Sequence, residues 1–436
     1  MKPLQIPVEH QSLSNGLHVV IAPDSAAPVV TVGVYYKIGF RLEPQGRSGF
    51  AHLFEHMMFQ GSENAAKMQH IKLINSSGGV LNGSTMYDVT NYYEAVPSNA
   101  LERVLWLEAD RMRALKVDDE NLRNQRDVVK EEVRVNVMNQ PYGGFPWLDM
   151  PPVAFRNWAN AHNFYGDFAD LDAASLADVQ AFFRAYYVPN NAVLLILGDV
   201  NPAQGFVLAE KYFAPISAGP APKFADPTEP RQIEERRGDV IEKFGTLPAM
   251  AIGYVLPQRR TADWCAMGLL DQFLHGGRAG RIYRELVLEK QLAVEAEGGI
   301  DDIFGYNGPA QMTTRILHKP EVSSEATLAA FDAIVADVQQ KGITDSELEQ
   351  IKIKWRSDYF GTLEGGRGGY IPKYGLMHLL ACFTLFDGEP QLVNSILDGF
   401  LAVSRQHVQD VALRYLKPEN RAIVFRKPVS GQQEAA

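Results

Sequence analysis

The segment Ser48-Gly49-Phe50-Ala51-His52-Leu53-Phe54-Glu55-His56-Met57-Met58-Phe59 lies near the start of the 436-residue chain. We interpret it as a helix that begins after Ser48 as its N-cap. In such a helix His52 and His56 are four residues apart, so both imidazoles lie on one face and can reach one ion. Glu55 precedes His56 and can hold a water beside that ion. The segment therefore predicts a metal site with a carboxylate next to it.

The order His-x-x-Glu-His is the inverse of the His-Glu-x-x-His zinc motif and predicts the same division of roles: two imidazoles bind Zn²⁺, and the carboxylate takes a proton from water. A catalytic zinc usually has a third protein ligand. We expect it from a second helix, over residues 119–138, which carries Asp127, Glu131 and Glu132. The spacing leaves adjacent Glu131 and Glu132 both open. The alternative is that these acids only form a solvated helix face.

Composition narrows the class of protein. With 46% hydrophobic residues, the chain can bury two or more cores. Its net charge of −10 argues against nucleic acid or an anionic membrane as a partner. Only Cys265 and Cys382 occur, so no disulfide framework is indicated. The start of the chain shows no apolar leader, and the longest apolar run, residues 376–386, is too short to span a membrane. We expect a soluble protein, cytoplasmic or periplasmic.

The pattern of strands and helices predicts the fold class. Alternating segments flank the turn Asn15-Gly16, a helix is expected over residues 65–74, and paired strands over residues 80–86 and 89–96. Strands and helices that come in runs are typical of an α+β fold. We therefore expect a mostly antiparallel sheet with helices packed on one face.

The second half of the chain repeats the first. Pro28-Val-Val-Thr-Val-Gly33 is echoed by Pro248-Ala-Met-Ala-Ile-Gly253, and two further matches follow in the same order. A Pro-rich stretch separates the halves. We predict two homologous domains, with an N-terminal metal-binding domain over residues 1–213, a linker over 214–230 and a C-terminal domain over 231–436.

The repeat predicts that only one domain carries the metal site. If Phe59-Gln60-Gly61 aligns with His275-Gly276-Gly277, the positions opposite the His-x-x-Glu-His residues are Gly268, Asp271 and Gln272. None of the three is a histidine. The C-terminal domain is therefore expected to keep the helix and lack the metal ligands.

The His-x-x-Glu-His segment, the acidic pair in Val128-Val129-Lys130-Glu131-Glu132-Val133-Arg134 and the two homologous halves together resemble the M16 family of zinc metallopeptidases. In size the chain is similar to the branch with bacterial processing-type peptidases and mitochondrial processing peptidase. The resemblance covers essentially the whole chain and implies a zinc-dependent endopeptidase subunit that hydrolyses extended peptides or unfolded proteins. It implies Glu132 as the third zinc ligand, beside His52 and His56, and Glu55 as the catalytic carboxylate.

The resemblance also implies where substrate binds. An extended peptide would add as a strand to the edge formed by residues 80–86, with Asn82 near the scissile bond. Two residues depart from the family pattern here. Gly83 stands where a small side chain such as Ala is usual, and Gln125 stands where the family often has a second glutamate.

A further departure concerns the C-terminal domain. Related peptidases supply from it an Arg and a Tyr that hold the substrate and stabilise the oxyanion, and this chain has Val287 and Val294 at those places. Neither valine donates a side-chain hydrogen bond. We expect a homologous M16-type partner, in a heterodimer, to supply the pair. Alternatively, Arg281 or Tyr283 replaces it within this chain.

Two other classes of function stay open. One is a non-catalytic scaffold subunit of an M16-like complex, which would need neither the His-x-x-Glu-His segment nor the third glutamate. The other is a protein that binds metal without turnover.

Overall fold

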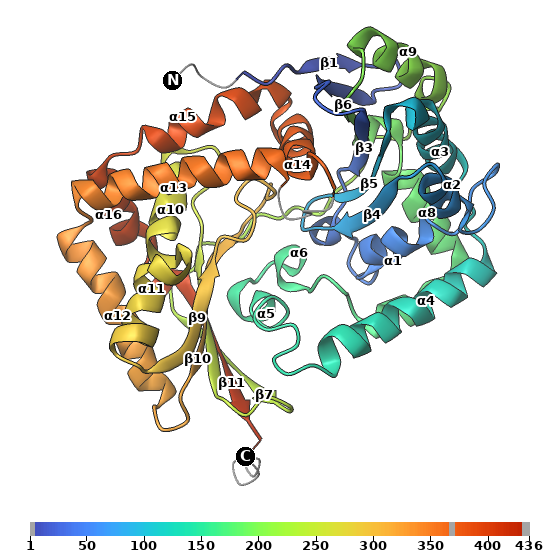
Figure 1. Ribbon diagram of the computed structural model, residues 1–436. Helices are drawn as coiled ribbons and strands as arrows, with labels where there is room; N and C mark the ends of the chain where they lie inside the picture. The colour runs from blue at the N-terminus through green and yellow to red at the C-terminus, as the bar shows by residue number, and fades with distance from the viewer. Residues whose placement is uncertain (1–4, 366–370, 430–436) are drawn as a thin grey trace. The chain divides into compact units, whose positions relative to one another are not determined.

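The computed structural model describes residues 5–365 and 371–429 (Figure 1). The expectation about the start of the chain falls partly on residues 1–4, which lie outside the described residues. The chain forms two compact units, each built from three separate segments. Unit 1 comprises Met1–Glu131, Phe164–Asp226 and Tyr359–Ile396; unit 2 comprises Glu132–Asn163, Pro227–Asp358 and Leu397–Ala436. The domain boundaries predicted from the repeat stay a prediction. They divide the chain by homology, whereas the two units divide it by which segments pack together.

Unit 1 contains a six-stranded sheet in the order β1-β2-β6-β3-β5-β4. The β2 and β6 strands pair in parallel, and the other neighbours pair antiparallel. The β4 strand is the last in this order, so within the described part of the chain one of its edges pairs with a strand of the sheet, β5. The strands are β1 (Glu9–Ser12), β2 (His18–Pro23), β3 (Val29–Tyr36), β4 (Val80–Thr85), β5 (Thr90–Pro97) and β6 (Ala192–Gly198).

Unit 2 contains a five-stranded sheet in the order β7-β11-β8-β10-β9. Its strands are β7 (Arg236–Glu242), β8 (Ala249–Val255), β9 (Ala293–Gly299), β10 (Gln311–His318) and β11 (Arg421–Pro428). The β7 and β11 strands are parallel and the other pairs antiparallel, as for β2 and β6 in unit 1. The order matches β2-β6-β3-β5-β4 strand for strand. The predicted α+β fold with two homologous, mostly antiparallel sheets is confirmed.

The register shows the same repeat. Val32 pairs with Glu94 on one side and Ile196 on the other. Ile252, which is 220 residues further along the chain, pairs with Thr314 and Ile423 in the same way. The offset is that of the repeated segments in the sequence.

Helices of unit 1 bury one face of its sheet. Alternate residues of β3, such as Val32 and Val34, face a core that is built mainly with α1, α3, α8 and α9. The helices of unit 1 are α1 (Phe50–Met57), α2 (Gln69–Ser76), α3 (Leu101–Ala114), α7 (Phe168–Ala173), α8 (Leu176–Tyr186), α9 (Pro202–Phe213) and α14 (Tyr374–Cys382). The α2 helix begins later than the predicted residue 65, because Met68 at φ +62° has non-helical backbone and the helix starts after it.

The opposite face of the unit 1 sheet is covered from the other half of the chain. There the Thr31 hydroxyl donates to the Pro372 carbonyl at 2.8 Å, and Tyr35 packs on His378 of α14 with ring centroids 5.8 Å apart. A Cβ on Gly33 would lie 2.4 Å from the sulfur of Met377, which is on α14. The close approach of α14 to β3 therefore requires a glycine at this position. Both faces of β3 are therefore buried, and the apolar run 376–386 is largely a helix inside the fold.

Unit 2 is covered in the reciprocal way. Residues 145–155 pack on the face of its sheet that holds Ala251 and Val424. The helices with residues in unit 2 are α5 (Pro151–Ala154), α6 (Trp158–Ala161), α10 (Ala262–His275), α11 (Arg281–Tyr283), α12 (Ser324–Lys341), α15 (Ile396–Leu401) and α16 (Arg405–Tyr415). The α4 (Asp119–Val133) and α13 (Asp345–Glu364) helices contribute residues to both units. In the described chain, no helix is long and apolar enough to cross a bilayer.

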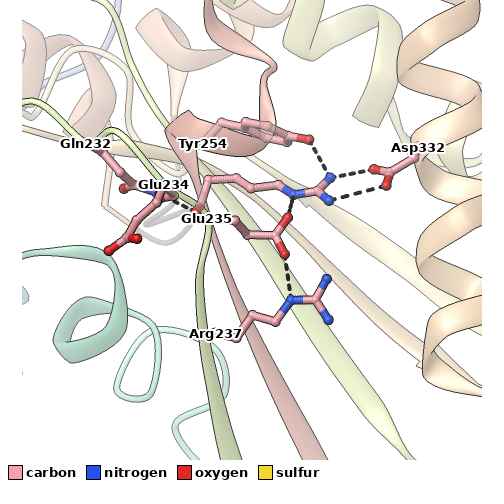
Figure 2. A network of polar contacts seen from close by, with 7 residues as sticks. Gln232, Glu234, Glu235, Arg237, Tyr254 and Asp332 are labelled. Atoms are coloured by element: carbon pink, nitrogen blue, oxygen red, sulfur yellow. Dashed lines mark hydrogen bonds and ion pairs between the residues drawn. The ribbon is translucent and has the colours of Figure 1, made fainter.

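The chain that follows the Pro-rich stretch is anchored in unit 2 by one arginine (Figure 2). The Arg421 Nε atom donates to Glu235 at 2.6 Å, its Nη1 atom donates to the Tyr254 hydroxyl at 3.3 Å, and its Nη2 atom donates to Asp332 at 3.3 Å. Gln232 in turn donates to the Arg421 carbonyl at 2.6 Å. A buried guanidinium thus joins β11, β8, α12 and the chain that leads into β7.

Candidate metal centre

The candidate site is built on α1, whose start differs from the predicted one. The N-cap is Gly49, at φ +83°, and not Ser48, whose hydroxyl donates to Asp170 at 2.6 Å. The buried carboxylate of Glu43 takes the capping role and accepts from the backbone nitrogens of Gly49 and Ala51 at 2.8 and 2.6 Å. Sequence reasoning missed Glu43 because it lies outside the helix and the local capping pattern.

The two predicted histidine ligands lie together on α1. The ring centroids of His52 and His56 are 5.0 Å apart, with the ring planes at 85°. His52 is 2% exposed and packs against Phe164 and Tyr165, at centroid distances of 4.8 and 5.1 Å, whereas His56 is half-buried. One imidazole is therefore held by aromatic rings, and the other faces a more open side.

Glu132 joins this pair from α4, which continues as a π-helix over Arg134–Met138. One ligand atom from each of His52, His56 and Glu132 can be chosen so that all three lie within 4.8 Å of one another. Glu131 is exposed and is not in this group. Two imidazole nitrogens and one carboxylate oxygen are a donor set that suits Zn²⁺. This geometry favours Glu132 over Glu131 as the third ligand.

Glu55 lies on the same helix and meets strand β4, which lies beside α1 in Figure 1. Its carboxylate accepts a hydrogen bond from the Thr85 hydroxyl at 2.8 Å. Gly83 is buried on the same strand, and a Cβ there would lie 3.3 Å from the Glu55 Cγ atom. Asn82 is exposed, and its Oδ1 atom accepts from the Gly83 backbone nitrogen at 2.9 Å. Sequence reasoning placed Asn82 and Gly83 on this strand but missed Thr85.

Val287 and Val294, which stand where the family resemblance implies an Arg and a Tyr, lie in unit 2. Val287 is half-buried in the π-helix Arg284–Glu289, and Val294 is 47% exposed on β9. Of the two alternatives, Arg281 donates to Glu285 at 2.7 Å and to Asp337 at 2.6 Å. Tyr283 stacks with the guanidinium of Arg278, 5.6 Å from its ring centroid.

A second group with metal-like spacing lies in the core of unit 1. It consists of His70, Glu94 and Glu108, all buried. Arg111 is buried with them, and it donates to Glu94 at 3.3 Å and through Nε to Glu108 at 3.0 Å. Burial raises the pKa of both carboxyls and lowers the pKa of His70 to about 3. The guanidinium already supplies the positive charge that a metal would bring, so this cluster is a structural network that joins α2 and α3 to β5.

The fold and the site together define an α+β protein with two homologous sheets and, among the described residues, a His-His-Glu cluster beside a further glutamate. Two family models match the chain: insulinase (peptidase family M16) over residues 18–142, and the peptidase M16 inactive domain over residues 173–354. The zinc protease PqqE of Helicobacter pylori is 30% identical over 438 residues, which cover 96% of this chain and 93% of that protein. The chain belongs to peptidase family M16.

Two other similarities agree with this membership. A crystal structure of a protease from Helicobacter pylori superposes with a TM-score of 0.88 at 28% identity, and the match covers 97% of this chain and all of that one. Subunit 1 of the bovine mitochondrial cytochrome b-c1 complex is 29% identical over 205 residues, or 47% of this chain and 42% of that protein. The proteins to which the chain is similar thus include a zinc protease and a subunit of a larger complex.

The buried cluster around Arg111 generates a stability prediction. Replacing the arginine in Arg111→Met leaves two buried carboxyls without their cation, and we expect a loss of about 3–5 kcal/mol in the free energy of unfolding. The Glu108→Gln variant keeps a hydrogen-bonding group and removes a carboxyl that burial already disfavours as an anion, so it is expected to lose about 1 kcal/mol. Urea unfolding followed by circular dichroism measures both. Equal losses in the two variants would contradict the assigned roles.

Proposed function

We propose that the chain is the zinc-binding subunit of a metalloendopeptidase that hydrolyses extended peptides or unfolded proteins. The observation that carries the proposal is the convergence of His52, His56 and Glu132 within 4.8 Å, with Glu55 on the same helix as the two histidines. Membership of a family with zinc proteases supports it.

In this proposal His52, His56 and Glu132 hold the ion, and the aromatic rings beside His52 keep its imidazole in place. Zn²⁺, when bound, supplies a Lewis acid and lowers the pKa of a water. Glu55 accepts the proton of the attacking water and returns it to the amine that leaves. Glu55 is a base in this scheme, and so its replacement is expected to stop turnover without removing the ion.

The peptide is proposed to bind along β4. Among the described residues, no strand of its sheet pairs with one edge of β4, and Val80 and Asn82 are exposed on this strand. An added strand forms main-chain hydrogen bonds, which are tolerant of side-chain sequence. Asn82 is proposed to lie near the scissile bond. A substrate must be extended over several residues to pair along this edge, so extended or unfolded substrates are favoured.

The proposal includes a partner. Chemistry at Glu55 needs a donor for the developing oxyanion, and Val287 and Val294 provide none from their side chains. Arg281 is held by two carboxylates. We therefore propose a heterodimer in which a homologous M16-type subunit supplies the Arg and Tyr. The similarity to a cytochrome b-c1 subunit favours a second candidate, a non-catalytic scaffold subunit.

The first test measures metal content. We expect one zinc per chain, lost in His52→Ala and Glu132→Ala, because each variant removes one of three ligands. Glu55→Gln should keep the zinc, and Glu131→Ala, the matched control beside Glu132, should keep it as well. Elemental analysis of the purified variants gives the answer. Full zinc in Glu132→Ala, or loss of zinc in Glu131→Ala alone, would contradict the ligand assignment.

The second test measures turnover of a quenched extended peptide. We expect the zinc-loaded chain to cleave it poorly alone and at least about a hundredfold faster with a homologous chain of the same genome that keeps the Arg and Tyr. Glu55→Gln in the same mixture should be inactive. Robust cleavage by the single chain would defeat the heterodimer and direct attention to Arg281 and Tyr283. No cleavage in any mixture, with zinc bound, would favour the scaffold.

A further inference from the structure

Strand β4 contacts α1 at the proposed catalytic glutamate as well as offering an edge for the peptide. Thr85 and Gly83 are two residues apart on β4, so both face the same side of the sheet. Both are buried; Thr85 donates a hydrogen bond to Glu55, and a Cβ at Gly83 would lie 3.3 Å from the Glu55 Cγ atom. The exposed Asn82 lies between the strand's start and these two residues and faces the other side.

The contact of Thr85 is directional. Its hydroxyl donates to the Glu55 Oε2 atom at 2.8 Å, and its distance to the Ala51 carbonyl of α1 is 3.4 Å. A hydroxyl has one hydrogen, so the shorter contact identifies the carboxylate as its main acceptor. Thr85 is the last residue of β4 and is 8% exposed. Because it is buried, its side chain has little freedom.

Gly83 leaves room beside Glu55. A Cβ at this position would lie 3.3 Å from the Glu55 Cγ atom and 3.2 Å from the ring of Tyr92. A larger residue at this position would therefore crowd the Glu55 side chain. The Tyr92 hydroxyl also donates to the Phe54 carbonyl at 3.1 Å, which ties the same turn of α1 to β5.

From the hydrogen bond of Thr85 we propose that this threonine is a positioning residue for Glu55. The inference rests on the proposed function and deepens it. Strand β4 would both bind the peptide and hold the Glu55 carboxylate. The distance between the substrate backbone and this carboxylate would therefore be set by β4. Loss of the Thr85 hydroxyl should then lower kcat more than it changes KM.

Three variants separate positioning from stability. Thr85→Val removes the donor at nearly constant volume, and Thr85→Ser keeps it. Thr90→Val is the matched control, because Thr90 is a buried threonine directly opposite Thr85 in the strand pair and its hydroxyl donates to the Ile38 carbonyl at 2.7 Å. The same hydroxyl loss therefore occurs in the same hairpin without touching Glu55.

The first readout is structural and does not depend on turnover. In crystal structures of the zinc-loaded chain, Glu55 should keep its rotamer in the wild type, Thr85→Ser and Thr90→Val, and leave it in Thr85→Val. An unchanged Glu55 in Thr85→Val would overturn the proposal. This readout stands even if the wild type cleaves no peptide, a result that would count against the proposed function alone.

The second readout is kinetic, under the conditions in which the wild type cleaves the quenched peptide. Thr85→Val should lose about tenfold or more in kcat, with KM within about twofold and zinc content unchanged. Thr85→Ser and Thr90→Val should keep kcat within about twofold. Equal losses of kcat in Thr85→Val and Thr90→Val, or no rescue by serine, would refute a positioning role.

Discussion

The candidate site depends on one constraint. Helix α1 must keep a fixed position along its axis, and a fixed rotation about that axis, relative to β4 and β5. Three polar contacts impose it. Glu43 caps the first turn, the Tyr92 hydroxyl binds the Phe54 carbonyl, and Thr85 binds Glu55. Because His52, Glu55 and His56 share one helix, fixing α1 fixes all three. Only Glu132, the third proposed ligand, then has to come from another helix, α4.

The helix is also fixed by how deeply its sheet is buried. The central strand β3 is covered on one face by the core around α1 and α3 and on the other by α14, from near the end of the chain. Unit 2 takes its second cover from residues 145–155. Each sheet thus completes its burial with a segment from the other half of the chain. A strand buried on both faces has little room to shift, which makes it a rigid base for a site on the neighbouring strands.

The two homologous sheets show how one fold can carry different interiors. At matched positions of β5 and β10, unit 1 has Glu94 and unit 2 has Thr314. Glu94 belongs to the charged cluster with Arg111, whereas Thr314 contacts His275, which also contacts Asp271 of α10 at 2.8 Å. Asp271 is the residue that the repeat places opposite Glu55. In unit 2 this position serves packing of its own helix and the end of β9, where it accepts from the Ile300 nitrogen at 3.1 Å.

The sequence by itself determined the features that depend on neighbours along the chain. The spacing of His52 and His56 follows from the helical repeat, and the strand patterns and the 220-residue repeat predicted the two homologous sheets. The sequence left open whether Glu131 or Glu132 is the third ligand, because adjacent residues on a helix differ only in what they face. Tertiary structure alone decided that Glu132 joins the histidines, that Glu43 rather than Ser48 caps α1, and that Thr85 reaches Glu55. These contacts join residues whose separation in sequence carries no periodic signal, so only the packing of helices on the sheet brings them together.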